Sequence, residues 1–342
     1  MSIRKAQEFY QSLTPQQKHF VDNKTINTTL SISHWISFLK KASDYDEYGD
    51  KARNSLGIRI AIFGIAAFVF VFLALGTETY YPLIGTAILA IFLFNAIQTR
   101  IAFASRDINN YLRVFFMPFL EILKQKAGEE AKLSAALDFR DPVKSLPPEN
   151  YDIKVHGRTR KVKLYEPKMI IAGVTLADQS YIETVVLDEI RNISYSNARG
   201  KSKSKTKTLH RLFIKLTVDK KVYKRKSSSI PSHIEFSENE NSLIFKLKHR
   251  EKEQTYGILN LKVFFSMLGT LYGLIEPLRP MDSPVITPEE STGVIQSTPG
   301  SGIINAMVWD DLIFDSYDYD STLRRRGGIL GADDESRNIF DS

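Results

Sequence analysis

Two long apolar segments constrain this chain more than any other feature. Residues 60–75 and 80–97 contain no Asp, Glu, Lys or Arg, and only residues 76–79 separate them. At about 1.5 Å of rise per helical residue, each segment is close to the length that crosses roughly 30 Å of hydrocarbon. A connection this short favours antiparallel pairing, so the sequence predicts a transmembrane helical hairpin over residues 58–98. The alternative is a buried helical pair in a soluble core, but core helices are seldom apolar on every face over such a length.

The charges that flank the hairpin predict its orientation. Glu78 is the only charged residue in the connection, whereas basic residues precede the first segment and follow the second. Positive flanks are retained in the cytoplasm, so we expect an integral membrane protein with two spans and both termini cytoplasmic. The flanking basic residues are Lys40, Lys41, Lys51, Arg53, Arg59, Arg100, Arg106 and Arg113.

Three residues inside the hairpin have expected packing roles. Gly64 and Gly85 carry no side chain and should let the two helices approach closely. Asn95 is the one amide within a span. We expect it to form an inter-helix hydrogen bond rather than to serve transport.

Helical patterns are expected on both sides of the hairpin. Residues 1–57 form a polar, helical cytoplasmic region, and residues 14–17, Thr-Pro-Gln-Gln, match a capped helix start. Residues 99–140 are predicted to form a juxtamembrane helix, because large apolar residues recur there at helical spacing. Pro118 lacks an amide hydrogen and crowds the preceding turn, so it should kink or restart that helix.

The pattern changes over residues 151–276. Apolar residues repeat at every second position in several segments, which is the period of a half-buried strand. After Asn260, which suits a helix cap, the helical period returns over residues 261–275. We therefore expect a cytoplasmic α+β domain, an antiparallel β-barrel or sheet closed by a C-terminal helix.

One stretch of this domain resembles a known family. Residues 185–195 read VVLDEIRNISY, and in the pleckstrin-homology-like barrel, including its bacterial versions, a strand often leads through an Asp/Glu-Ile-x-x-Ile step of this kind. Further strands and a closing helix then follow in that family. The resemblance implies this fold for residues 151–276 only, and it does not imply a ligand, because one fold carries many functions. An unrelated α+β domain with the same order of elements is the alternative.

Residues 199–226 form the most basic segment, with twelve Lys or Arg residues against one acid, Asp219. If a strand runs through the segment without a bulge, alternate residues place six cations on one outer face. Beside an anionic leaflet such a face gains on the order of 1 kcal/mol per basic residue, so phospholipid headgroups or an acidic partner are the expected ligands. The scarcity of interleaved aromatics argues against nucleic acid, and a solvated loop that binds nothing is the plain alternative. The six residues are Lys201, Lys203, Lys205, Lys207, Arg211 and Lys215.

The C-terminal region, residues 277–342, is rich in Pro, Ser, Thr and Gly and is predicted to be disordered. Residues 281–342 contain twelve acids and four Arg, a net charge of −8. Within them, residues 303–320 alternate large apolar residues with carboxylates, a composition typical of segments that fold on a partner. We expect this segment to bind a protein partner or the basic face of the same chain, and an idle tail is the alternative. Its candidate contact residues are Trp309, Leu312, Ile313, Phe314, Tyr317 and Tyr319.

No catalytic motif is found in the sequence. The six histidines are dispersed, cysteine is absent, and neither a Gly-rich nucleotide loop nor GxSxG occurs. We expect a protein that is not an enzyme and that takes no metal or cofactor. The favoured function is a membrane-anchored binding or scaffold protein. The alternatives are an oligomeric pore or channel with a cytoplasmic sensor domain, which the lack of charged pore-lining residues disfavours, and a membrane-bound enzyme with a polar pocket in residues 151–276.

Overall fold

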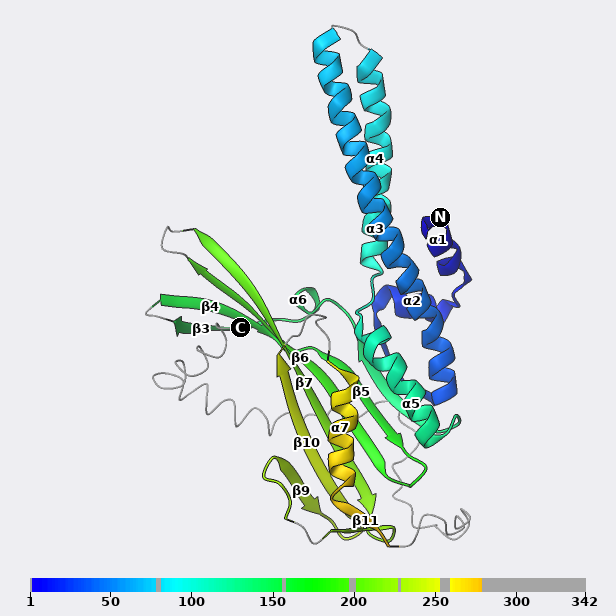
Figure 1. The fold of residues 1–342 in the computed structure, drawn as a ribbon, viewed down its shortest axis with the longest axis vertical. Coiled ribbons are helices and arrows are strands. Elements are labelled where there is room, and N and C mark those ends of the chain that lie inside the picture. Colours follow the sequence, from blue (N-terminus) through cyan, green and yellow to red (C-terminus); the bar gives the residue numbers. More distant parts are fainter. Residues whose placement is uncertain are drawn as a thin grey trace. The chain divides into compact units, whose positions relative to one another are not determined.

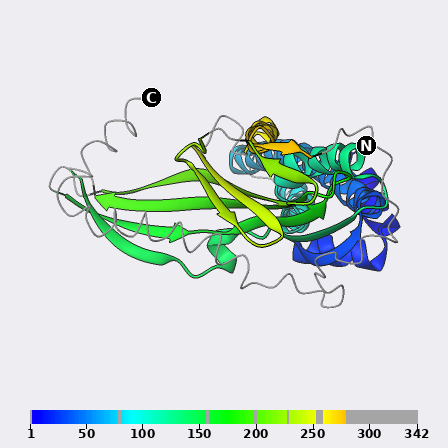
Figure 2. The same cartoon turned by 90° about the horizontal axis from the view of Figure 1, so that it is seen from below.

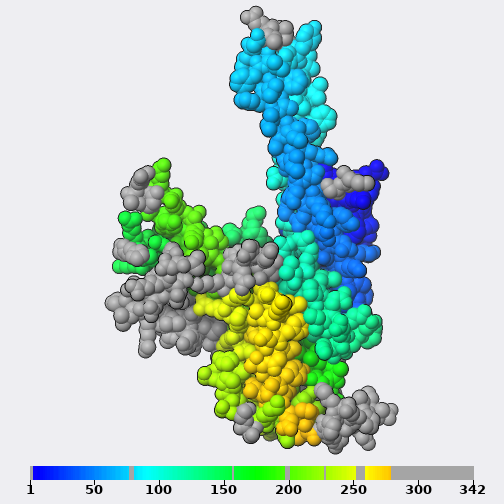
Figure 3. Space-filling model, in the orientation of Figure 1, coloured from blue at the N-terminus to red at the C-terminus, as the bar shows by residue number. Residues whose placement is uncertain are grey.

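The chain forms two compact units (Figures 1 and 3). The first consists of residues 1–25 and 33–120, and the second of residues 26–32 and the chain from residue 121 onwards. A short segment from the N-terminal region therefore belongs to a unit built mainly from the second half of the sequence. The computed structural model describes residues 2–77, 81–155, 158–196, 201–226, 229–252 and 259–278.

Two long helices dominate the first unit. α3 (Ile32–Thr77) and α4 (Tyr81–Ser105) are both long and apolar enough to cross a membrane, and Figure 1 shows them side by side. Almost none of the residues in their apolar parts is buried, whereas the core helices of a soluble protein would bury them. The prediction of two membrane-length helices is therefore confirmed.

The two helices touch closely at one of the two predicted glycines. A Cβ atom on Gly85 would lie 2.9 Å from the ring of Phe70, whereas nothing lies within 4 Å of a Cβ atom on Gly64. The inter-helix hydrogen bond expected of Asn95 is absent from the described part of the chain. Asn95 is exposed, and its backbone carbonyl accepts a hydrogen bond of 2.8 Å from the hydroxyl of Thr99.

Two short helices precede the hairpin. α2 (Pro15–Asn23) begins with the predicted capping box, in which Thr14 and Gln17 each accept a hydrogen bond from the backbone N–H of the other. α1 (Ser2–Ser12) contributes Ala6 to a small apolar cluster with both long helices. The other buried members of that cluster are Ala52, Leu56, Ala96 and Phe103.

Two segments that were predicted to be helical are strands. β1 (Thr25–Ser31) interrupts the predicted helical region 1–57, because it is rich in β-branched residues, which favour strands. β2 (Lys132–Asp138) ends the predicted helix 99–140, and its buried residues alternate with half-exposed ones, which is the strand period.

The remainder of the predicted juxtamembrane helix is divided. α4 ends at Ser105, and the chain becomes helical again as a π-helix, η1 (Leu112–Phe116), that leads into α5 (Met117–Ala127). The turns run from η1 into α5 without a break, so the chain does not restart at Pro118. A π-helical turn instead comes directly before the proline, and π-helical turns and prolines are two sources of distortion in a helix.

A nine-stranded sheet forms the body of the second unit (Figures 1 and 2). Its main path runs β1-β2-β5-β6-β7-β10-β9, and β4 branches from β6 and carries β3. Among the described residues β1 and β9 stay unpaired with each other, so an open sheet is seen and the barrel is not. The further strands are β3 (Glu149–Val155), β4 (Arg158–Tyr165), β5 (Lys168–Thr175), β6 (Tyr181–Ser196), β7 (Ser202–Asp219), β9 (Ile234–Glu238) and β10 (Ser242–Lys252).

The predicted closing helix is present. α7 (Leu261–Tyr272) begins at Asn260, whose side chain accepts a hydrogen bond of 2.9 Å from the N–H of Lys262. The helix contacts β7 and β10 and buries apolar side chains of its own. Three smaller elements complete the unit: α6 (Pro142–Ser145), and a second sheet of β8 (Tyr223–Arg225) with β11 (Ile275–Pro277). The predicted tail lies outside the described residues from residue 279 onwards.

β6 and β7 form a hairpin that runs well beyond the centre of the sheet. Their pairing continues without a register shift from Tyr181 opposite Thr217 to Ser196 opposite Ser202. The inner half of β6 pairs with β5, and the outer half pairs with β4, which pairs with β3. We call this four-stranded extension the arm, and Figure 1 shows it projecting from the rest of the sheet. It comprises residues 149–155, 158–165, 190–196 and 201–208.

Candidate functional site

The lysines that the sequence singled out follow one side of the arm. Because β6 and β7 pair without a bulge, side chains alternate strictly, and the odd-numbered residues of β7 share a face. Lys203 and Lys205 are exposed on β7, and Lys201 is exposed just before it, while Lys207 is half-buried. The four lysines were predicted to share one face only if the strand has no bulge, and β7 has none where it pairs with β6.

The other two predicted cations lie on the same side but nearer the centre of the sheet. Arg211 is only 9% exposed and forms ion pairs with Glu189 and Glu166. The Nζ atom of Lys215 lies 2.7 Å from a carboxylate oxygen of Glu183. Both cations form ion pairs with carboxylates of the sheet, and both are less exposed than Lys201, Lys203 and Lys205.

β4 brings further cations to this face, and sequence reasoning missed them. Val162 lies opposite Ile193 on β6, which lies opposite Lys205 on β7. Directly opposed residues point to the same side of a sheet, so the even-numbered residues of β4 lie on the same face as the lysines. Arg158 and Arg160 are among them. The sequence does show that residues 158–163 are basic. Only the strand pairing reveals that they share a face with the lysines of β7.

Apolar and aromatic side chains lie between the two rows of cations. Val162 and Ile193 are buried there. Tyr195 lies opposite Lys203, and the guanidinium carbon of Arg160 is 5.0 Å from the centre of its ring. Tyrosine and basic residues together suit a membrane–water interface. The aromatics missing from residues 199–226 are thus partly supplied by β6, and the whole arm carries ten basic and two acidic residues, a formal charge of +8.

A buried carboxylate anchors the base of the arm. Glu189 is fully buried and accepts hydrogen bonds from Arg191 and Arg211, and its third partner, Arg250 on β10, lies 3.4 Å away. Burial alone would raise the pKa of Glu189, but the three guanidinium groups hold it below its usual value. Glu189 therefore stays charged and holds together three cations that would otherwise repel one another.

The histidine on β7 has a structural environment. His210 is buried, and its Nδ1 atom lies 2.7 Å from a carboxylate oxygen of Asp188. His210 lies on the side of β7 on which Leu212 and Ile214 are also buried. In the part of the chain that the structure describes, no group of three His, Asp or Glu side chains could hold a metal ion.

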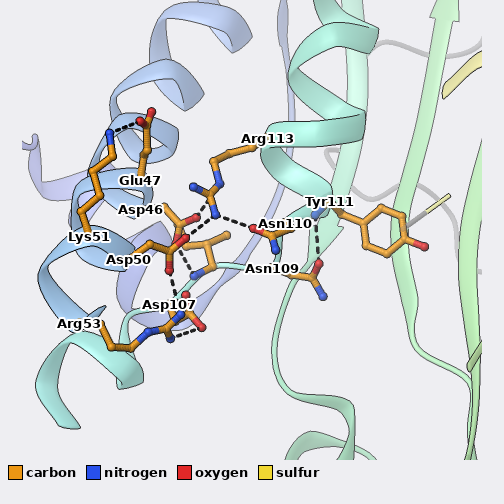
Figure 4. A network of polar contacts seen from close by, with 11 residues as sticks. Asp46, Glu47, Asp50, Lys51, Arg53, Asp107, Asn109, Asn110, Tyr111 and Arg113 are labelled. Atoms are coloured by element: carbon orange, nitrogen blue, oxygen red, sulfur yellow. Dashed lines mark hydrogen bonds and ion pairs between the residues drawn. The ribbon is translucent and has the colours of Figure 1, made fainter. Parts of the chain in front are cut away.

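The first unit contains a second cluster of charged groups, centred on Asp46 of α3 (Figure 4). Asp46 is 2% exposed. One of its carboxylate oxygens accepts a hydrogen bond of 2.8 Å from the N–H of Ile108, and the other lies 3.1 Å from Nε of Arg113. Burial raises the pKa of Asp46 to about 7, although the Ile108 N–H and Arg113 act against that rise.

Two arginines extend this cluster. Arg113 also contacts Asp50 at 2.6 Å, and Arg53 contacts Asp50 at 2.8 Å and Asp107 at 2.6 Å. The cluster thus joins α3 to the segment between α4 and η1 through three carboxylates and two guanidinium groups (Figure 4). Arg53 and Arg113, which the sequence identified only as flanking charges, are specific partners of these aspartates.

Comparisons with protein-family models, with curated protein sequences and with solved structures find no match. The resemblance of residues 151–276 to the pleckstrin-homology-like barrel therefore stays a prediction. The predicted partner segment, residues 303–320, lies outside the described residues.

Proposed function

We propose that this chain is a membrane-anchored binding or scaffold protein with two spans and both termini in the cytoplasm. Its arm binds the anionic phospholipid headgroups of the membrane that holds the hairpin. The observation that carries the proposal is the charge of +8 on four paired strands, with Tyr195 among the cations of one face. An acidic protein partner would meet the same chemistry, and the experiment below separates the two.

The proposed hairpin tethers the arm to the membrane that the arm binds. Tethering keeps the effective concentration of the arm at the membrane surface high.

The expected energetics are additive and sensitive to salt. Each basic residue near an anionic leaflet contributes about 1 kcal/mol, and the field is screened within about 10 Å at 0.1 M salt. Lys201, Lys203, Lys205 and Lys207 together should supply a few kcal/mol at low ionic strength, which is enough to hold a tethered arm at the surface.

The chain has no cysteine, so one labelled site tests the proposal in the full-length protein. Ile153→Cys on β3, which lies opposite Arg160, places a fluorophore on the face of the arm that carries the lysines without removing a charge. We expect quenching by nitroxide-labelled headgroups in anionic proteoliposomes, with a several-fold loss in neutral ones and at high salt. Equal quenching in neutral and anionic vesicles contradicts the proposal, and quenching that appears only with an added acidic protein favours the protein partner.

A charge-matched pair of variants assigns the effect to the arm. Changing Lys201, Lys203, Lys205 and Lys207 to Gln should abolish the quenching. The control changes four exposed lysines of the same unit outside the arm and should leave the quenching intact. These control residues are Lys221, Lys224, Lys226 and Lys262.

The acidic segment 303–320 is proposed to compete for the arm or to bind a protein partner. Residues 281–342, which include this segment, have a net charge of −8, opposite in sign to the charge of the arm. If the segment covers the arm, deleting residues 303–320 should increase the headgroup quenching of the same label. If the segment binds only a separate protein, the deletion should leave the quenching unchanged.

One observation favours the alternative, an oligomeric pore. Asn95 lies in an apolar span and is exposed on α4, and amides within membranes often bond to a neighbouring helix. In this reading Asn95→Leu lowers the oligomer size in detergent, and the wild-type protein lets ions leak from liposomes. A monomer without leakage removes the alternative.

A further inference from the structure

A pocket of about 350 Å³ lies in the first unit between α1, α3 and α4. Its walls combine amides from Gln7 and Gln11, the ring and hydroxyl of Tyr45, Thr99 from α4, and Arg106, which directly follows α4. Ala102 is a small residue in the same wall. The volume is at the lower end of the range for small-molecule sites, which suits a headgroup rather than a whole lipid.

The position of the pocket along α4 sets its depth relative to a bilayer. The apolar segment ends at Ile97, and the lining residues in and directly after α4 run from Thr99 to Arg106. Eight helical residues rise about 12 Å, and the polar region beyond the hydrocarbon is about 5–7 Å thick on each side. With the hairpin inserted, the pocket therefore begins at the level of the headgroups.

The charged group of the pocket is held in place by its neighbours. The guanidinium carbon of Arg106 lies 4.1 Å from the centre of the Tyr10 ring, and its Nε atom is 3.0 Å from Asp22. The Tyr10 hydroxyl donates a hydrogen bond of 2.7 Å to the same carboxylate. Asp22 thus contacts one edge of the Arg106 guanidinium group. Because a guanidinium group has five N–H donors in a fixed planar arrangement, the other edge can still donate to a ligand.

The remaining lining groups are neutral hydrogen-bonding groups. Burial raises the pKa of Tyr45 to about 12, so its hydroxyl keeps its proton at physiological pH. Because Asp22 offsets the charge of Arg106, the site suits a single negative charge better than a double one. A phosphodiester carries one negative charge and several acceptor oxygens, which the donors of Arg106, Tyr45 and Thr99 could satisfy.

We propose that this pocket holds the phosphodiester headgroup of one glycerophospholipid, with Arg106 as the phosphate ligand and the acyl chains alongside the exposed apolar surface of α4. The proposal rests on the membrane insertion that the proposed function includes, but not on the arm. The pocket binds one lipid in a defined site, whereas the arm contacts a surface.

Native mass spectrometry of the full-length protein, extracted in mild detergent from vesicles of phosphatidylglycerol and phosphatidylcholine, tests this site. We expect one phospholipid to remain bound. Ala102→Phe fills the pocket and should lower the bound fraction at least tenfold. Ala104→Phe adds the same ring to a neighbouring exposed residue that does not line the pocket, and it should retain the lipid.

Two further measurements separate the outcomes. Arg106→Gln, checked for an unchanged thermal unfolding midpoint, should also lose the lipid, while changing Lys201, Lys203, Lys205 and Lys207 to Gln should not. Equal retention in the Ala102 and Ala104 variants, or retention of inorganic phosphate alone, overturns the proposal. Resistance of the protein to alkaline extraction from vesicles reports insertion separately, so an inserted protein without bound lipid defeats the pocket and leaves the anchoring intact.

Discussion

Two buried carboxylates of this chain respond to burial in opposite ways, and the number of arginines beside each explains why. Glu189 has three guanidinium neighbours, and its pKa lies below the usual value. Asp46 has one close guanidinium partner, Arg113, and other aspartates nearby, and its pKa rises to about 7. Removing a carboxylate from water favours its neutral form unless enough positive charge compensates. Asp46 is therefore the group whose protonation changes near neutral pH.

This difference predicts a pH dependence for the first unit. The pKa of Asp46 rises from 3.8 to about 7 on folding, so between about pH 4 and pH 7 the folded state binds a proton that the unfolded state has released. The stabilisation is complete below that window and is lost as the pH rises through 7. Its size is on the order of 4 kcal/mol, since each unit of pKa corresponds to about 1.4 kcal/mol.

The Asp46→Asn variant isolates this contribution. The wild-type protein in detergent should unfold at a lower temperature at pH 8 than at pH 5, and the variant should lose most of that difference. Asp44→Asn, outside the hydrogen-bonded cluster, should behave like the wild type. An identical pH dependence in wild type and Asp46→Asn would show that Asp46 does not hold the proton.

Among the elements, the hairpin of α3 and α4 has one close contact that a glycine permits. Lipid is as apolar as the helix surface, so close packing at small residues, rather than burial from water, holds membrane helices together. Gly85 permits that packing, because an added Cβ would come 2.9 Å from the ring of Phe70. Gly64 has open space around it, although the sequence suggested the same role for both glycines.

Leucine substitutions at the two glycines should therefore have unequal effects. Gly85→Leu forces the ring of Phe70 to move and should destabilise the hairpin by about 1–3 kcal/mol, the usual cost of overpacking. Gly64→Leu should change little or stabilise slightly, because a helix gains from losing a glycine. Thermal unfolding in nanodiscs compares them, and a larger effect at Gly64 would show that the helices pack through another face.

On the scale of the whole molecule, the second unit is discontinuous in sequence. β1 comes from residues 25–31 and lies at the edge of the sheet beside β2. Strand β1 leads directly into α3, and the N–H of Ile32 donates a hydrogen bond of 3.0 Å to the carbonyl of Ala131. The strand that leads into the long helix α3 is thus itself part of the sheet.

A fragment that starts after the hairpin should therefore behave poorly. Residues 121–278 lack β1 and expose the edge of β2, and exposed edges promote aggregation. We expect this fragment to elute as aggregates in size-exclusion chromatography, and the same fragment with residues 25–32 fused through a flexible linker to elute as a monomer. A monomeric fragment without β1 would show that the edge is dispensable.

Strand pairing also decides which of the predicted site residues form ion pairs within the sheet. By their spacing in the sequence, Lys203 and Lys215 are equivalent members of one face. Glu183, from a different strand, pairs with Lys215, whereas Lys203 extends into the arm. Conversely, Arg160 was not among the predicted site residues. Arg160 lies on β4, far from β7 along the chain, and the two strands lie on either side of β6.

The sequence by itself determined the features that depend on neighbouring residues. These are the two membrane-length helices, the capping box at Thr14, the helix start at Asn260 and the alternation along β7. Each follows from length, period or a cap within one segment. Only the tertiary structure decided the place of β1, the partners of Glu189 and the cations that join the arm, because strand hydrogen bonds and buried ion pairs join residues that no local pattern relates.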